Sequence, residues 1–454
     1  MPPTTLRRRS RVSLEEADAN QAELPLSFKR ADQHAALAEP VRSATNLGEQ
    51  LAAFQEFGEA TRTSHTSSRS FAGDPIDVIT YINEYWTARQ RQANALHEVS
   101  YRACFKPQLP RFFIERLTQL SERVYDPFMG RGTTLLEAAL LGRVPLGCDI
   151  NPLSLTFIRP RLQPPRLEQI DARLREIPFQ NYSEYPEDLL AFYHPDTLKE
   201  LCALKAYLLR RQTVGSFDSV DDWIAMVAVN RLTGHSPGFF SVYTLPPNQA
   251  TSVKAQIRIN QRRQQVPPLR RIGHIIHKKS KQLLSDCTAE VRCRLGQVCD
   301  QALMLTSPAH CTPAIASDSV ALVVTSPPFL NIVQYATDNW LRCWFLGIDA
   351  KSVKLTVPTK LETWQQAMTD VFRELYRVLK PGGHIAFEVG EVHKGATRLE
   401  EAVLPCGMVV GLTPLLILIN DQEFTKTANC WGIDNMTKGT NTNRIVVFQK
   451  PQGG

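Results

Sequence analysis

The stretch that decides the fold of this chain runs from Asp126 to Thr134 and reads DPFMGRGTT. Before it, the short apolar run Val124–Asp126 predicts a strand, and Thr133–Leu141 predicts a helix that begins at its end. Pro145–Asp149 predicts a second strand directly after that helix. A strand, a glycine-containing turn, a helix and a strand in close succession make a βαβ unit, and such units build parallel sheets. The sequence therefore predicts an α/β fold.

The turn in this stretch is suited to binding a ligand. Gly130 and Gly132 allow a ligand to approach the backbone closely, and the following helix offers free N–H groups in its first turn. No Gly-Lys-Ser/Thr follows, which excludes a phosphate-binding loop of that kind, and the third glycine of the dinucleotide fingerprint is missing. Asp149 stands 17 residues after Gly132, where doubly wound sheets place an acid that binds a ribose. The alternative for Asp149 is a capping role before Asn151-Pro152.

A second loop follows another apolar strand. Ser319–Val324 predicts the strand, and Thr325–Phe329, which reads TSPPF, comes directly after it. Two consecutive prolines stiffen the loop and remove two N–H donors, so the Ser326 side chain and the carbonyls near Pro327 remain as acceptors. They lie at a strand's carboxyl end, where such sheets bind ligands. Phe329 adds a plane for stacking, and the alternative for the whole loop is a plain turn.

The rest of the chain divides around these two loops. Trp364–Leu379 predicts a helix that ends at Lys380–Gly383, which reads KPGG and is typical of a helix stop and a turn. Further strands are predicted at 384–389, 415–419 and 444–448, and further helices at 47–57, 77–97, 109–120, 189–211 and 220–232. We expect four segments: a mostly flexible tail at 1–75, half of a sheet domain at 76–160, a largely helical insertion at 161–295, and the other half of the sheet domain at 296–454.

Composition and charge narrow the class of protein. The chain has 454 residues, of which 43% are hydrophobic and 21% charged, and this excludes wholesale disorder, a collagen and a small disulfide scaffold. The net charge is +7, but the segment 251–285 alone carries nine basic residues and no acid, so the remainder is slightly negative. One basic segment on a near-neutral body indicates a polyanionic partner, and a solvated helix face is the alternative. The basic residues are Lys254, Arg258, Arg262, Arg263, Arg270, Arg271, Lys278, Lys279 and Lys281.

Cysteines and apolar runs indicate a cytoplasmic protein. The ten cysteines form no CxxC pair, so we expect structural or free thiols and no metal site, as in a reducing cytoplasm. The first 50 residues contain no apolar run of a secretory signal. Ala402–Ile419 has no charge over 18 residues, but two prolines and two glycines interrupt it. We interpret it as a loop and a buried strand, not as a membrane helix.

At this point the chain resembles the amino-methyltransferases of DNA, which use S-adenosylmethionine. The stretch 126–134 resembles their cofactor loop, and 325–329 resembles their catalytic loop. Phe105–Pro110 resembles the segment that lines the methionine end of the cofactor, and 380–383 and 440–444 are also similar. The resemblance covers about residues 101–151 and 300–448.

The resemblance implies a Rossmann-like methyltransferase sheet with helices on both faces, split by the insertion, which would read DNA. It implies a catalytic loop made of Ser326, Pro327, Pro328 and Phe329. The cofactor residues that it implies are Lys106, Pro107, Asp126, Pro127, Phe128, Gly130, Gly132, Thr133, Thr134, Asp149 and Asn151. Asp300 is the nearest match to the acid on the adenine side, although no Gly-Asp pair precedes the next strand. No flavin, nicotinamide or metal is implied.

The predicted activity is methyl transfer to the exocyclic N4 of cytosine in double-stranded DNA, because in this family a Ser before the two prolines favours that amine. The target base must be flipped out of the duplex, and stacking on Phe329 contributes about 1–3 kcal/mol toward that cost. No Pro-Cys pair occupies a predicted strand-end loop, which disfavours cytosine C5 chemistry. Alternatives are adenine-N6 methylation of DNA, an RNA amino-methyltransferase, or a non-catalytic relative. A cognate restriction endonuclease is a candidate partner.

Overall fold

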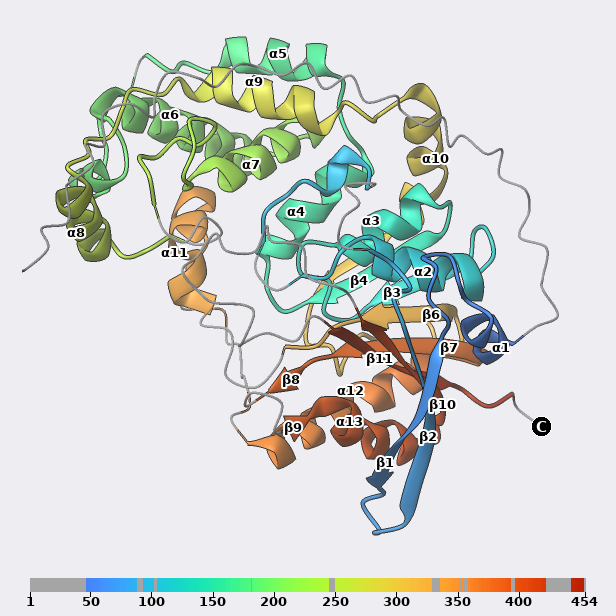
Figure 1. Ribbon diagram of the computed structural model, residues 1–454. Coiled ribbons are helices and arrows are strands. Elements are labelled where there is room, and N and C mark those ends of the chain that lie inside the picture. Colours follow the sequence, from blue (N-terminus) through green and yellow to red (C-terminus); the bar gives the residue numbers. More distant parts are fainter. Residues whose placement is uncertain are drawn as a thin grey trace, which may run out of the picture. The chain divides into compact units, whose positions relative to one another are not determined.

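The computed structural model describes residues 46–87, 93–101, 104–180, 182–244, 250–328, 335–350, 353, 358, 360–392, 397–421 and 442–452. In this part of the chain nine strands form one sheet (Figure 1). In sheet order they are β1 (Arg62–Arg69), β2 (Pro75–Asn83), β10 (Thr413–Asp421), β11 (Thr442–Gln449), β7 (Leu379–Val389), β6 (Val320–Thr325), β3 (Arg123–Asp126), β4 (Val144–Asp149) and β5 (Leu303–Thr306). A separate two-stranded ribbon pairs β8 (Glu391–Val392) with β9 (Thr397–Arg398).

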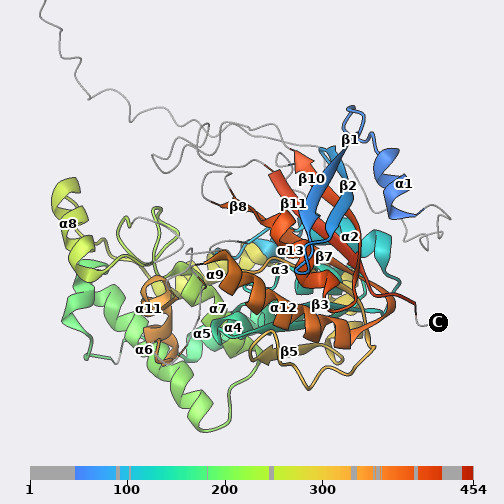
Figure 2. The ribbon, with the colours of Figure 1, turned by 90° about the horizontal axis from the view of Figure 1, so that it is seen from below.

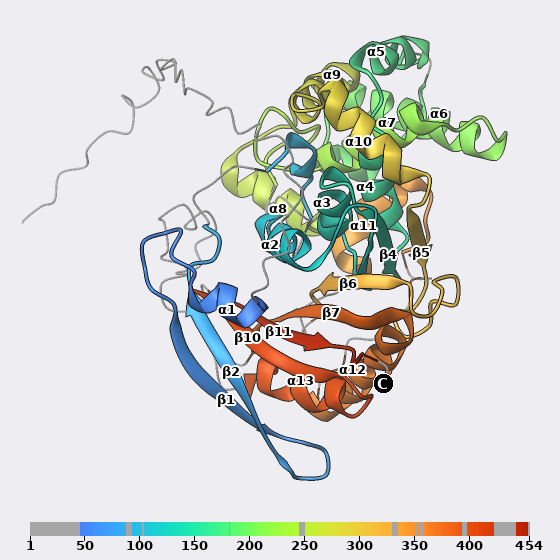
Figure 3. The same cartoon turned by 90° about the vertical axis from the view of Figure 1, so that its right-hand side faces the viewer.

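Strands β7, β6, β3, β4 and β5 are parallel, and β11 runs antiparallel between β7 and β10. Helices cover both faces, as predicted: α1 (Leu47–Ala52), α2 (Gln108–Leu117) and α3 (Thr133–Leu140) on one, α12 (Leu361–Val378) and α13 (Leu399–Met408) on the other (Figures 1 and 3). Successive strand residues point to opposite faces. Val124 accordingly packs in a core cluster with Phe113 of α2, and Tyr125 in one with Phe372 of α12.

The predicted helix at 364–379 is confirmed as α12, with Trp364, Met368, Phe372 and Leu375 buried at helical spacing. It ends where β7 begins. The turn predicted at 380–383 is wrong, since these residues belong to β7, and Gly382, whose φ of +75° favours glycine, lies where the pairing with β6 shifts register. The strands predicted at 124–126, 145–149, 319–324, 384–389, 415–419 and 444–448 all form, within a few residues of their expected ends.

The helix predicted at 77–97 is wrong. Residues 75–83 form β2, and only the short 3-10 turn η1 (Ala95–His97) is helical in the described part of this segment. Ile79 and Ile82 have helical spacing, but the segment is rich in β-branched residues, which favour a strand. β2 pairs with β10 in the sheet, and β1 pairs with β2, so an ordered strand occupies part of the expected N-terminal tail. The helix expected near 47–57 is present as the shorter α1.

The uncharged stretch 402–419 is helical in its first part, where we predicted a loop. Pro405 lies inside α13 and cannot donate to the carbonyl four residues earlier, which belongs to Glu401. Ser68 on β1 donates to that carbonyl instead, at 2.7 Å. A Cβ at Gly407 would lie 2.5 Å from Phe448, so glycine lets α13 approach β11 closely. Nowhere in the described chain is a helix both long and apolar enough to cross a membrane.

The chain between β4 and β5 is helical, as predicted (Figures 1 and 2). Its helix α7 packs on α4, and α10 packs on α3 and β4. The helix α11 (Tyr335–Leu346), which follows the proline loop, contacts α6 and α7. The helical elements between β4 and β5 are α4 (Leu153–Leu162), α5 (Leu167–Glu176), η2 (Glu187–Ala191), α6 (Pro195–Thr213), α7 (Ser219–Arg231), α8 (Val253–Arg263), α9 (Ile272–Leu283) and α10 (Ala289–Cys299).

A buried amide joins the N-terminal strands to the rest of the sheet. Asn420 of β10 is fully buried, and its side-chain oxygen accepts from the N–H groups of Tyr85 at 2.6 Å and Trp86 at 3.1 Å. Its Nδ2 donates to the carbonyl of Trp86 at 3.2 Å. These three bonds fix the chain where it leaves β2.

We expect Asn420→Ala to lower the free energy of unfolding by about 2–4 kcal/mol, because each buried polar group left without a partner costs about 1–3 kcal/mol. Equilibrium denaturation in urea measures the change. Thr63→Ala on β1 is the control, because Thr63 is exposed and its side chain has no hydrogen bond to any residue that the structure describes. The expected change is within about 0.5 kcal/mol. Equal stability of Asn420→Ala and the wild type would contradict the role given to this amide.

Candidate active site

The two motif loops leave the sheet at neighbouring strands. β3 lies between β4 and β6, so the strand order reverses beside β3. In open α/β sheets the ligand crevice lies outside the carboxyl ends of the strands at such a point. The loop at 126–134 leaves the carboxyl end of β3, and the loop beginning at Ser326 leaves that of β6. The topology therefore brings together the residues predicted for the cofactor and for catalysis.

Two hydrogen bonds connect these loops directly. Thr325 Oγ1 donates to Asp126 Oδ1 at 2.6 Å, and Thr134 Oγ1 donates to the carbonyl of Val324 at 3.1 Å. Asp126 also accepts from the N–H of Phe128 at 3.0 Å. Burial raises the pKa of Asp126 to about 7, although the hydrogen bonds from Thr325 and Phe128 act in the opposite direction. Asp126 thus organises the loops from inside the protein, where it is almost fully buried.

The glycines of the first loop are required by its shape. Gly130 and Gly132 have φ of +49° and +75°, which favour glycine. A Cβ at Gly132 would lie 2.7 Å from Ile158 on α4. A third glycine, Gly147 on β4, was not predicted; a Cβ there would lie 2.6 Å from Leu135 of α3, so it permits close packing of helix and strand. Close packing of this kind is the role of the third glycine in the dinucleotide fingerprint.

Asp149 closes the loop from the end of β4. Its Oδ2 accepts from the N–H of Gly130 and its Oδ1 from the N–H of Asn151, both at 2.8 Å. Burial raises its pKa. The bond to Asn151 is the capping interaction considered as the alternative role. The Ser154 side chain also lies near this carboxylate and lowers its pKa. A carboxylate has about four acceptor positions, so these partners do not use all of them.

Asn151 and Tyr101 form the neighbouring wall. Asn151 Nδ2 donates to Tyr101 Oη at 2.7 Å, and its Oδ1 accepts from the N–H of Leu153 at the start of α4. The Tyr101 ring packs on Phe157, with centroids 5.2 Å apart, and also lies near Gly130. Tyr101 was not predicted, because nothing in its local sequence distinguishes it from a core aromatic.

The segment before α2 lies beside the first loop. Arg131 Nη2 donates to the carbonyl of Phe105 at 3.4 Å, and its Nε donates to Thr133 Oγ1 at 3.0 Å. Pro107 is the N-cap of α2, and Lys106 is exposed, with a pKa that partial burial lowers. The segment that contains Lys106 and Pro107 thus adjoins the loop through Phe105, and Pro127 is buried within the loop. The cofactor roles of these residues stay predictions.

A side chain of α12 binds the proline loop, which begins at Ser326. Trp364 Nε1 donates to the carbonyl of Pro328 at 3.1 Å, while Pro327 is buried and Ser326 is partly exposed. A carbonyl held in this way keeps the orientation of the loop. Phe329 lies outside the described residues, so its stacking role stays a prediction.

Glu388 is the functional candidate that sequence reasoning missed. It lies at the end of β7 and accepts from Asn443 Nδ2 at 2.5 Å. Burial raises its pKa to about 6, while Asn443 and the nearby Ser326 side chain act in the opposite direction. The pKa of the Cys104 thiol is raised by burial and, to a smaller extent, by Glu388. The signal was a single acid within the apolar run 385–389, a position that normally excludes charge.

Asp300 is not brought to this site. It is the C-cap of α10 and precedes β5, whereas Asp149 is at the carboxyl end of β4. β4 and β5 are parallel, with Asp149 paired with Thr306. Asp300 therefore lies at the amino end of β5, whereas the candidate site lies at the carboxyl ends of the strands. The prediction for Asp300 is wrong. The residue that follows β5, Ser307, occupies the corresponding position and donates its N–H to the carbonyl of Asp149 at 3.2 Å.

The predicted basic segment divides between two helices. Lys254, Arg258 and Arg262 are exposed at intervals of four residues on α8, and Lys278 and Lys281 are exposed on α9. The others have protein partners: Arg263 lies over the Tyr243 ring at 3.9 Å, Arg271 pairs with Glu200 at 2.7 Å, Lys279 pairs with Glu98 at 3.3 Å, and the backbone of Arg270 bonds to Thr197.

Comparisons with known proteins agree with this arrangement. A family model described as a DNA methylase matches residues 56–157. The chain is 33% identical over 75 residues to the Type II methyltransferase M.MjaII of Methanocaldococcus jannaschii, covering 16% of this chain and 14% of that protein. It is 23% identical over 283 residues to the Type II methyltransferase M.BsoBI of Geobacillus stearothermophilus, covering 56% and 53%. The chain thus spans about half, or less, of the length of these relatives.

Among solved structures, a DNA modification methylase of Thermus thermophilus, TTHA0409, complexed with S-adenosyl-L-methionine, is 23% identical to this chain. The match covers 31% of this chain and 51% of that one, with a TM-score of 0.19. The family match and the sequence relatives support an amino-methyltransferase family of the N4/N6 type.

We expect Gly132→Ala to destabilise the protein by about 2–5 kcal/mol, because a left-handed φ costs a non-glycine residue about 1–2 kcal/mol and overpacking adds about 1–3 kcal/mol. Thermal unfolding measures the change. Gly215→Ala is the matched control, since its φ is +70° but no atom lies within 4 Å of a Cβ there. Equal losses for the two variants would show that the contact with Ile158 does not require glycine.

Proposed function

This chain is a relative of the N4/N6 amino-methyltransferases, and we propose that it transfers a methyl group from S-adenosylmethionine to the exocyclic N4 of a cytosine flipped out of double-stranded DNA. The observation that carries the proposal is the pairing of the two loops at the switch point, where Thr325 of the proline loop donates to Asp126 of the glycine loop. The Ser at position 326 favours cytosine over adenine by its resemblance to the cytosine-N4 enzymes.

The residues around the glycine loop fit S-adenosylmethionine. Asp149 lies at the carboxyl end of β4, where it can accept from a ribose hydroxyl in addition to its bonds from Gly130 and Asn151. Gly130 has no side chain and a φ of +49°, so its backbone is bare toward a ligand, while the Tyr101 ring is in contact distance on the side where a Cβ would be. The segment containing Lys106 and Pro107 lines the other side of the loop. When bound, the cofactor supplies a methyl group on a positively charged sulfur.

The chain must make a weak nucleophile reactive. The lone pair of an exocyclic amine is delocalised into the ring, so acceptors that hold its N–H groups help the nitrogen to become pyramidal. Ser326 Oγ and the carbonyl of Pro327 are such acceptors on a loop that the Trp364 bond keeps in place. The amine is thereby oriented with its lone pair toward the methyl group.

The proton released by the amine needs an acceptor. As the N–C bond forms, the nitrogen carries one proton too many, and Ser326 can take it while it passes its own proton to Glu388. The Ser326 side chain acts on the pKa of the Glu388 carboxyl, which supports a proton path between these two groups. Asn443 Nδ2 holds the other side of that carboxylate and fixes its orientation.

DNA is the substrate that the surface charge favours. The exposed row on α8 and the exposed lysines of α9 present positive charge that neutralises phosphates, with an affinity that falls steeply with salt. The sequence relatives are Type II methyltransferases. We therefore also propose that the protein acts within a restriction–modification pair in the cytoplasm, with an endonuclease as its partner.

The direct test is nucleoside mass spectrometry of DNA and RNA from a host that lacks modification enzymes and expresses this chain. We expect N4-methylcytosine in DNA, and a loss of at least about 100-fold for Ser326→Ala, the size typical of losing a proton-transfer group. Binding of S-adenosylmethionine, measured by calorimetry, stays unchanged in the variant.

N6-methyladenine in DNA would keep the fold and the mechanism but overturn the choice of base. A mark in RNA alone would overturn DNA as the substrate. Cofactor binding without any mark would indicate a non-catalytic relative.

Protonation of Glu388 should limit the rate at low pH. Since burial raises its pKa to about 6, the carboxylate that accepts the proton is lost as the pH falls through 6, and kcat/KM should decrease about tenfold per unit below that value. In Glu388→Gln we expect a low rate at every pH, without the decrease of kcat/KM below pH 6, which is the acid limb of the pH profile. Asp126, with a pKa of about 7, is present in both proteins, so the comparison isolates Glu388. An unchanged limb in Glu388→Gln would remove Glu388 from the proton path.

A further inference from the structure

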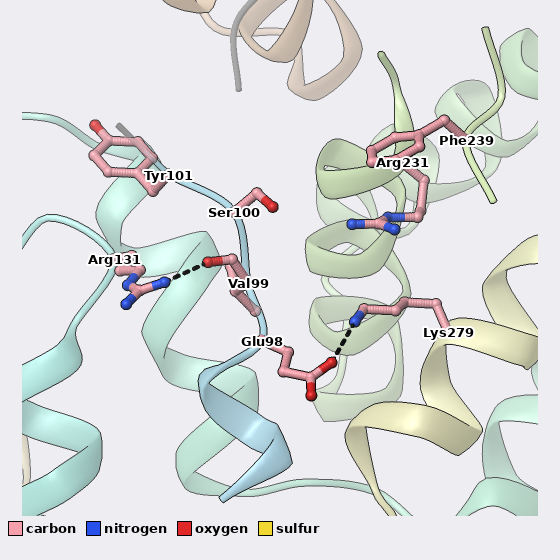
Figure 4. A pocket seen from close by; sticks show the side chains of 8 residues that line it. All are labelled: Glu98, Val99, Ser100, Tyr101, Arg131, Arg231, Phe239 and Lys279. Atoms are coloured by element: carbon pink, nitrogen blue, oxygen red, sulfur yellow. Dashed lines mark hydrogen bonds and ion pairs between the residues drawn. The ribbon is translucent and has the colours of Figure 1, made fainter. Parts of the chain in front are cut away.

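A cavity of about 460 Å³ lies between the glycine loop and the helical insertion (Figure 4). One wall comes from the loop after η1 and from Arg131, the residue between the two loop glycines. The opposite wall comes from α7, α9 and Phe239. Its lining consists of Glu98, Val99, Ser100, Tyr101, Arg131, Arg231, Phe239 and Lys279. Tyr101 also borders the proposed cofactor site and Arg131 belongs to the glycine loop, whereas Arg231, Phe239 and Lys279 take no part in the chemistry described above.

The cavity contains more positive than negative charge. Arg131, Arg231 and Lys279 line it together with a single carboxylate, that of Glu98. Glu98 accepts from Lys279 Nζ at 3.3 Å and is half exposed, while the Lys279 side chain is only 9% exposed. Burial lowers the pKa of both Arg231, to about 10, and Lys279. Positive charge that is removed from water is costly unless a negative charge compensates it, and the one exposed acid compensates only part of the charge in this cavity. A further anion would compensate the rest.

Arg231 is prepared to bind such an anion. Its guanidinium lies 4.2 Å from the centroid of the Phe239 ring, which fixes its plane. Its Nε donates to the carbonyl of the preceding residue, Asn230, at 2.9 Å. For its two terminal nitrogens no hydrogen bond is found within the part of the chain that the structure describes. A planar fork with two free donors matches two oxygens of a phosphate.

The cavity is connected rigidly to the cofactor loop. Arg131 Nη1 donates to the carbonyl of Val99 at 2.8 Å, and the N–H of Ser100 donates to Asn230 Oδ1 at 2.7 Å. The loop at 98–101 is thus held on one side by the glycine turn and on the other by α7, next to Arg231. An anion bound here has a fixed position relative to the methyl-transfer site.

We propose that this cavity binds a phosphate of the substrate DNA backbone, with Arg231 and Lys279 as its ligands. The proposal rests on the proposed function and adds to it the point at which the backbone is held. A phosphodiester is favoured over a small free anion because α9 also carries the exposed Lys278 and Lys281 on its other faces. Their positive charge attracts a polyanion more strongly than a single small anion.

The test is the salt dependence of DNA binding by the full chain. A fluorescein-labelled duplex of mixed sequence is titrated over a range of NaCl concentrations, and the slope of log K against log salt is measured. Each phosphate contact contributes about 0.9 to the slope. We expect Arg231→Gln and Lys279→Gln each to reduce its magnitude by about 0.9, while calorimetric binding of S-adenosylmethionine is unchanged.

Matched variants separate the cavity from general surface charge and from misfolding. Arg175→Gln removes an exposed arginine of the same insertion, on α5, and should leave the slope unchanged. Arg231→Lys keeps the charge and should retain the wild-type slope. If Arg231→Gln and Lys279→Gln melt like the wild type and keep its slope, the proposal is overturned.

Two further results would also overturn it, and they differ from a failure of the proposed function. Loss of S-adenosylmethionine binding with an unchanged DNA slope would assign the cavity to the carboxylate of the cofactor. Equal loss of slope in Arg175→Gln would assign the effect to net charge. If the wild-type chain itself does not bind DNA, the DNA substrate fails, and the phosphate site fails with it.

Discussion

The structure depends on the hydrogen bonding that joins the carboxyl ends of β3 and β6. Thr325 donates to Asp126, and Thr134 donates back across the same junction to the carbonyl of Val324. These bonds connect loops that are almost 200 residues apart in the chain. Asp126 is nearly inaccessible to solvent, so losing a partner there leaves a buried polar group unsatisfied, which is costly. The relative position of the glycine loop and the proline loop is therefore strongly determined.

Along the same edge of the sheet, burial acts on three carboxylates that have different partners. Asp126 bonds to both loops, Asp149 bonds to backbone N–H groups of its own turn, and Glu388 bonds to the Asn443 side chain of β11. Burial raises the pKa of each. Ser326, on the loop predicted to hold the target amine, acts on the pKa of Glu388, and for that reason Glu388 is the carboxylate proposed to exchange a proton with the substrate.

The helical insertion packs against the sheet domain, and its basic residues differ in their surroundings. Its helix α7 packs on α4, and α11, which follows the proline loop, packs on α6 and α7. Charges that are adjacent in sequence have different surroundings there: Lys278 is exposed, whereas Lys279 is buried against Glu98. A helix turns by about 100° per residue, so neighbouring lysines face solvent and the cavity, respectively. A count of basic residues in the sequence cannot separate these two roles.

The sequence by itself determined the α/β class, most strand positions, both loops and the helical nature of the insertion, because these follow from local periodicity, glycine and proline. It misplaced β2, Asp300 and the helix around Pro405, because each depends on which strand or side chain lies alongside: β10, the direction of β5, and Ser68. It also missed Glu388, Tyr101 and Arg231, which have no local pattern. Only the tertiary structure decided these, since the energy of a buried polar group is set by partners that are distant in the chain.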